Sequence, residues 1–167
     1  PLAATALPPL PFTPALFYSR PVLMPSLYTE IEINAPCRQV WRALFHKEGW
    51  MYWNTYLYDC DPRRPFIEGN DVLLSVRRLP GEAETEFQSR VTVIHPEVCL
   101  QLVSTIPGLR HKQTFELQAL GRDRTYYRHH HSFRGLLGRV VLPFIQTDEH
   151  NGIQRMAWEL KHYTESL

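Results

Sequence analysis

Apolar and polar residues alternate along most of the chain, and the alternation is interrupted at regular intervals by turn residues. A period of two predicts strands at residues 27–34, 71–79, 84–94, 98–105, 109–119 and 124–134. Between the later strands lie the predicted turns Pro80-Gly81, His95-Pro96-Glu97, Pro107-Gly108 and Gly121-Arg122-Asp123. Strands joined by connections this short predict an antiparallel meander.

Two segments show helical spacing instead. The first begins at Pro36, which suits the first turn of a helix, and ends near Gly49. The second runs from Gly135 to the C-terminus, and Pro143 is expected to kink it or delay its start. Its predicted buried stripe comprises Leu137, Val141, Ile145, Gly152, Met156, Leu160 and Tyr163. A sheet with one apolar face needs a cover, and only this helix is long enough. The predicted fold class is therefore α+β of the helix-grip type, a curved antiparallel sheet wrapped around a long C-terminal helix.

The N-terminus differs in composition from the rest of the chain. Residues 1–26 are rich in proline and alanine, nearly uncharged and without periodicity, so we expect a disordered extension there. They lack the basic region and compact apolar block of a signal peptide, and Met24 is one candidate for the natural start. With 167 residues in total, residues 27–167 are predicted to form a single ligand-binding domain.

Charge and cysteine content narrow the classes of partner. The formal net charge of +1 creates no overall field that would predict binding to nucleic acid or to an anionic membrane. The three cysteines, Cys37, Cys60 and Cys99, are scattered and without a C-x-x-C spacing, which argues against a disulfide framework and a structural zinc site. No apolar run is long enough for a transmembrane segment. We expect a cytoplasmic protein without a cofactor.

Several short motifs, taken in order, resemble the SRPBCC superfamily, which includes START lipid-transfer domains, the major birch pollen allergen and bacterial polyketide cyclase/dehydrase-like proteins. The motifs are Ile33-Asn34-Ala35-Pro36 with Val40-Trp41, Trp53-Asn54, Glu68-Gly69-Asn70, Phe133-Arg134-Gly135, and Gly152-Ile153 with Met156, Leu160-Lys161 and Glu165. Thr55 stands where the family's W-N-P motif has proline. The resemblance runs from about Tyr28 to Glu165. It implies a helix-grip cavity that holds a small hydrophobic molecule, lipid, polyketide or terpenoid-like.

Candidate chemistry is concentrated on the last two strands. If their hairpin turns about Arg122, Phe115 pairs with His129, and Gln113 pairs with His131. His111 then lies diagonal to His131, at a distance that side chains can bridge. The residues predicted to line this wall of the cavity are His111, Gln113, Phe115, Tyr127, His129 and His131.

Three interpretations of these histidines remain open. Three imidazoles could bind zinc, although no carboxylate falls at an obvious position and a register error of one residue would separate them. His129 or His131, with Tyr127 beside them, could act as a general acid or base on a bound substrate, although no paired carboxylate accompanies them. The third interpretation, which we prefer, is a polar lining that orients a ligand without chemistry and without a metal.

Aromatic and helical residues complete the predicted ligand site. Trp53 and Tyr56 are expected at the mouth of the cavity, whereas Trp41 is assigned to the core. On the closing helix, Ile145 and Met156 are the expected contacts, with Gly152 leaving space beside them. The alternative is that this apolar stripe is plain core.

The preferred function is a soluble binding or carrier domain for a small hydrophobic ligand. The alternative is a polyketide cyclase or dehydratase-like enzyme that uses a cavity histidine. A protein-interaction module is a third hypothesis, and it would require an exposed apolar patch that no segment predicts.

Overall fold

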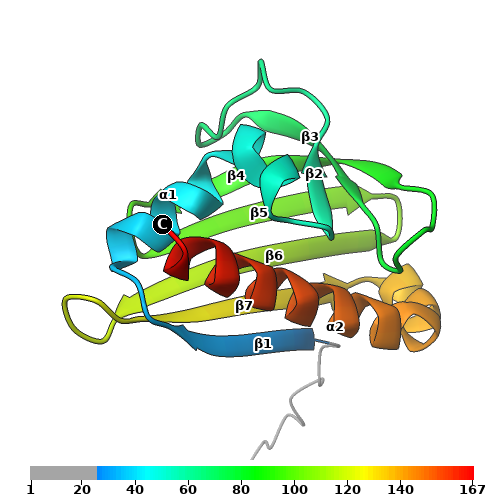
Figure 1. Cartoon of the computed structure of the whole chain (residues 1–167). Coiled ribbons are helices and arrows are strands. Elements are labelled where there is room, and N and C mark those ends of the chain that lie inside the picture. The colour runs from blue at the N-terminus through cyan, green and yellow to red at the C-terminus, as the bar shows by residue number, and fades with distance from the viewer. Residues whose placement is uncertain (1–25) are drawn as a thin grey trace, which may run out of the picture.

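The computed structural model describes residues 26–167. Its elements in chain order are β1 (Ser26–Ile33), α1 (Cys37–Phe45), the 3-10 helix η1 (Lys47–Tyr52), β2 (Leu57–Asp59), β3 (Asp71–Val76), β4 (Thr85–His95), β5 (Cys99–Ile106), β6 (Leu109–Ala119), β7 (Thr125–Arg134) and α2 (Leu136–Glu165). One seven-stranded antiparallel sheet has the order β1-β7-β6-β5-β4-β3-β2. The sheet curves around α2, and α1 lies beside the C-terminal end of that helix (Figure 1). The predicted α+β helix-grip fold is confirmed. Residues 1–25 of the predicted extension lie outside the described residues.

The register of the last hairpin is the one that alternation predicts. Phe115 pairs with His129 and Gln113 pairs with His131. One boundary and one strand differ from the prediction. Strand β3 ends at Val76 rather than near residue 79, and β2 was not predicted because its three residues are too few to show a period. A bulge between Val91 and Val93 interrupts the pairing of β4 with β5, as expected where a sheet bends strongly.

The predicted stripe of α2 is correct only in its C-terminal half. Gly152, Met156 and Leu160 are buried, whereas Leu137 and Val141 are 41% and 38% exposed. The first turns instead bury Gly138, where a Cβ would already lie 3.2 Å from Leu109. The helix backbone thus approaches the sheet at a residue without a side chain. The apolar residues beside it, Leu136, Leu137, Val140 and Val141, are exposed. Pro143 lies inside the helix on its exposed side and does not delay its start.

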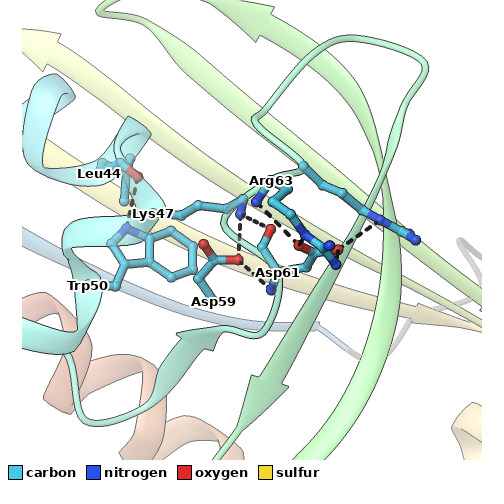
Figure 2. Close-up of polar contacts among 7 residues, drawn as sticks. Leu44, Lys47, Trp50, Asp59, Asp61 and Arg63 are labelled. Carbon is cyan, nitrogen blue, oxygen red and sulfur yellow. Dashed lines mark hydrogen bonds and ion pairs between the residues drawn. The ribbon is translucent and has the colours of Figure 1, made fainter.

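A buried ion pair, here called the Lys47 cluster, fixes the segment between η1 and β2 (Figure 2). Lys47 is 2% exposed and donates to a side-chain oxygen of Asp59 and, at 3.0 Å, to the backbone oxygen of Asp61. Nearby, the indole nitrogen of Trp50 donates to the Leu44 carbonyl at 3.0 Å. All of these partners come from one short stretch of sequence.

Candidate functional site

A hollow of about 1070 Å³ opens between the sheet and α2. On the face of the sheet toward α2 its lining comprises Val76, Arg78, Thr85, Phe87, Ser104, Ile106, Leu109, His111 and Gln113, with Glu149 from the helix. Further residues border the hollow, but alternation along the strands places them on the opposite face of the sheet: Asp71, Glu86, Gln88, Arg90, Val103, Thr105 and Arg110. The volume therefore combines an inner chamber with a groove outside the sheet.

Six polar side chains meet at the inner wall in what we call the Glu149 network: Tyr56, Arg78, His111, His129, His131 and Glu149. Glu149 Oε1 accepts a hydrogen bond from the Tyr56 hydroxyl at 2.6 Å, and its Oε2 accepts one from Arg78 Nε at 2.7 Å. His131 Nδ1 lies 3.1 Å from Glu149 Oε1 and 3.2 Å from His111 Nε2. His131 Nε2 lies 2.9 Å from His129 Nε2. The network thus joins β6, β7, α2 and the segments beside β2 and β3.

Hydrogen-bond chemistry assigns the protons in this network. A carboxylate only accepts hydrogen bonds, so the hydrogen is on His131 Nδ1. This N–H points to Glu149 Oε1 and also lies near His111 Nε2. The other ring nitrogen of His131, Nε2, faces His129 Nε2, and the direction of that hydrogen bond depends on which nitrogen carries the proton. Among the described residues, three buried side-chain atoms near the network are left without partners: Gln113 Oε1, Tyr127 OH and His129 Nδ1.

The surroundings also determine which groups are charged. Burial by itself would raise the pKa of Glu149, but the hydrogen bond and the charge interaction with His131, then the hydrogen bond from Tyr56 and the charge of Arg78, hold it well below its usual value. Burial, followed by the neighbouring His131, lowers the pKa of His111 to about 3. The same two causes lower the pKa of His129. At neutral pH the network therefore contains an ionised Glu149 beside neutral His111 and His129.

The predicted site residues separate into those that line the hollow and those that lie behind its wall. His111 and Gln113 line the hollow. Ile145 is half-buried and outside the lining. The fully buried residues behind the wall are Tyr56, Phe115, Tyr127, His129, His131 and Met156. The rings of His129 and Phe115 stack at 4.2 Å, and those of His111 and Phe133 at 4.5 Å.

The structure differs from two expectations about the site, one for Gly152 and one for Trp53. Gly152 does not leave empty space, because a Cβ there would lie 2.3 Å from the ring of Tyr56. That ring occupies the gap and directs its hydroxyl to Glu149. Trp53 stacks on Tyr163 at 6.0 Å and lines a separate hollow beside α1, so the structure does not bring it together with the histidines.

Sequence reasoning missed Glu149 and Arg78, which hold the centre of the network. The sequence does contain a signal for Glu149, because it falls in the gap between Ile145 and Gly152 at the spacing of the buried stripe. A carboxylate at such a position marks a paired buried charge. Nothing comparable identifies Arg78, which contacts Glu149 although it lies 71 positions earlier in the chain.

The donor atoms of His111, His131 and Glu149 lie within 4.8 Å of one another, and this ligand set suits zinc or ferrous iron. Contrary to the expectation from the sequence, a carboxylate does accompany the histidines. However, Glu149 already binds Arg78 and Tyr56. A fixed guanidinium charge on the same carboxylate opposes a divalent cation. These contacts fit a hydrogen-bonded network better than a metal centre.

Comparison with known proteins supports the fold. No family model and no curated protein matches this sequence. Among solved structures, a START superfamily protein from Mycobacterium smegmatis is similar with a TM-score of 0.64 and 15% identity, covering 84% of this chain and 97% of that one. Norcoclaurine synthase from Thalictrum flavum, in complex with dopamine and hydroxybenzaldehyde, has a TM-score of 0.61 and 14% identity over 86% of this chain and 88% of its own. The di-domain ARO/CYC protein BexL from the BE-7585A biosynthetic pathway has a TM-score of 0.61 and 14% identity over 85% of this chain and 47% of its own. These likenesses show the fold: the chain has the helix-grip architecture of the START superfamily protein, norcoclaurine synthase and BexL.

Proposed function

We propose that the chain binds a small, mostly apolar molecule in the inner chamber and holds one polar group of that molecule against the inner wall. The apolar part would contact Val76, Phe87, Ile106 and Leu109, and the polar group would meet Gln113, His111 and Arg78. A lining of this composition is typical of small-molecule sites. Lipid, polyketide-like and terpenoid-like molecules all have the required character.

The Gln113 amide is the observation that carries this proposal. Its Oε1 atom is buried in the chamber wall without a partner among the described residues. An unsatisfied buried polar group costs about 1–3 kcal/mol, and a ligand that hydrogen-bonds to it recovers part of that cost. The low pKa of His111 supports binding rather than catalysis, because a general base works best with a pKa near the operating pH.

Filling the chamber tests the proposal. Ser104 lies on the chamber face of β5 opposite His111, whereas Gln101 on the same strand faces outward. The probe is anilinonaphthalene sulfonate, which joins apolar rings to one anionic group. We expect one saturable site in the wild type, loss of that site in Ser104→Phe, and unchanged binding in Gln101→Phe. Equal binding by all three folded proteins would place the probe elsewhere and reject the proposal.

A second candidate is a cyclase or dehydratase-like enzyme, favoured by the connected His111, His131 and Glu149 side chains. In that case His111, the member that lines the hollow, would exchange protons with the substrate while His131 and Glu149 orient it. Native mass spectrometry of freshly purified protein separates the two candidates. A carrier retains the same small molecule in the wild type and in His111→Gln, whereas an enzyme retains a substrate of different mass in the variant.

Location in the cell stays a prediction. The three cysteines are free thiols in the structure, as expected in a reducing compartment such as the cytoplasm. Over residues 26–167, the helices are all too short or too polar to cross a membrane.

A further inference from the structure

Six exposed apolar side chains gather where α2 begins. We call this surface the α2 patch, and it comprises Ile106, Leu136, Leu137, Val140, Val141 and Phe144. Phe144, Leu136 and Val140 are 81%, 77% and 61% exposed. Their spacing of four residues puts them in one row on the side of the helix opposite Gly138 and Leu142, which are buried. Apolar patches of this kind mark binding surfaces.

The α2 patch is held rigidly against the rim of the hollow. The backbone nitrogen of Leu137 donates to the Gly108 carbonyl at 3.0 Å, which fastens the helix to the turn between β5 and β6. Gly135 has a φ of 104°, and a Cβ there would lie 2.3 Å from the Gly108 oxygen, so this approach requires glycine. Ile106, in the same hairpin, belongs both to the patch and to the lining of the hollow.

Unpaired positive charge accompanies the patch. Arg110 and Arg134 are direct cross-strand partners on β6 and β7. Arg139 is exposed in the first turn of α2. Among the described residues none of the three forms an ion pair. On the same strand Arg128 does, lying 3.5 Å from Glu30 and 3.7 Å from Glu116. Like charges placed opposite each other destabilise a sheet, so this arrangement favours an anionic partner.

We propose that the α2 patch binds the surface of a bilayer that contains anionic lipids. The apolar row enters the boundary between headgroups and acyl chains, while Arg110, Arg134 and Arg139 contact lipid phosphates. The net charge of +1 does not oppose this, because the arginines are concentrated beside the patch. The rim of the hollow then faces the membrane, where an apolar molecule can pass between lipid and protein without crossing water.

Vesicle flotation tests the proposal with the full chain. Vesicles of phosphatidylcholine with about 30% phosphatidylserine should bind the wild type, and binding should weaken as salt is raised from about 0.05 to 0.5 M. The double variant Leu136→Ser/Phe144→Ser should lose at least about tenfold in affinity. Arg134→Glu/Arg139→Glu should lose roughly 30-fold in affinity on these vesicles and little on pure phosphatidylcholine.

Trp158→Ser is the matched control, because Trp158 is 54% exposed near the other end of α2, and this variant should bind as the wild type does. Equal loss in this control, or no loss in the patch variants, would overturn the proposal.

A fluorescent reporter distinguishes the bilayer from other occupants. In Phe144→Trp, the emission of the added tryptophan, obtained by subtracting the wild-type spectrum, should shift to shorter wavelength only when the anionic vesicles are added. A short-wavelength emission already present without vesicles would mean that another part of the chain covers the patch. A shift that depends on protein concentration would mean self-association. Either result, or no shift at all, overturns the proposal.

Discussion

Among residues 26–167, charged side chains are buried in two places, and these places differ in what surrounds them. The Lys47 cluster draws its partners from residues 47 to 61 and lies outside the lining of the hollow. The Glu149 network draws its partners from segments between Tyr56 and Glu149, and three of its members line the hollow. The first fixes a local turn, whereas the second holds separate elements around a space.

An unpaired buried atom does not by itself distinguish the two. Asp59 Oδ2 in the Lys47 cluster lacks a partner among the described residues, as Gln113 Oε1 does beside the Glu149 network. Only Gln113 also borders a space that a ligand can enter. The comparison teaches that an unsatisfied polar atom indicates binding where it coincides with a cavity, and elsewhere is only a cost to stability.

The largest effect is expected from Lys47→Met. Removing the ammonium leaves Asp59 charged and buried without its partner, which should lower the free energy of unfolding by about 3–5 kcal/mol. Urea denaturation measures the change, and the affinity for anilinonaphthalene sulfonate should stay the same. Lys47→Met/Asp59→Leu should recover most of the loss. A folded Lys47→Met protein that no longer binds the dye would remove the distinction between the two regions.

Gly152→Ala should come next, because the added methyl group would overlap the Tyr56 ring. Overpacking of this kind costs about 1–3 kcal/mol. Gly49→Ala is the control, since a Cβ there meets nothing within 4 Å. Thermal unfolding of both variants measures the difference. Equal stability would show that Tyr56 is free to move away from the helix.

The pH dependence of stability is a smaller effect with a defined sign. His111 takes up a proton near pH 6.5 when unfolded but only near pH 3 when folded, so the unfolded state binds more protons between these values. Stability should therefore fall as the pH is lowered from 6.5 towards 3, by about 1.4 kcal/mol per pH unit for this one group.

Replacing His111 with phenylalanine, which keeps an aromatic ring against Phe133, should remove that part of the slope. Urea denaturation at several pH values between 6.5 and 4.5 provides the measurement, and the exposed His95, changed to glutamine, provides the control. An identical slope in wild type and His111→Phe would mean that His111 is protonated in the folded protein.

Local pattern was enough to predict the sheet and the pairing of Gln113 with His131, because a tight turn and a period of two leave one register. It was not enough for α2, where the position of the buried face depends on the close approach of Gly138 to β6 and β7. Glu149 was missed because the buried stripe of this helix was predicted from apolar residues and glycine, and Glu149 is charged. Arg78 and Tyr56 join Glu149 through contacts between distant parts of the chain, which periodicity does not encode.

Gln113→Leu tests the central claim most directly, because stability and binding should change in opposite directions. Removing an unpaired buried amide should leave the free energy of unfolding unchanged or raise it by about 1 kcal/mol. The affinity for anilinonaphthalene sulfonate, whose amine N–H can donate to Gln113 Oε1, should fall by about fivefold, the equivalent of one lost neutral hydrogen bond. Gln118→Leu, an exposed position on the same strand, should alter neither quantity. A Gln113→Leu protein that is less stable and binds the dye as tightly as the wild type would contradict the account.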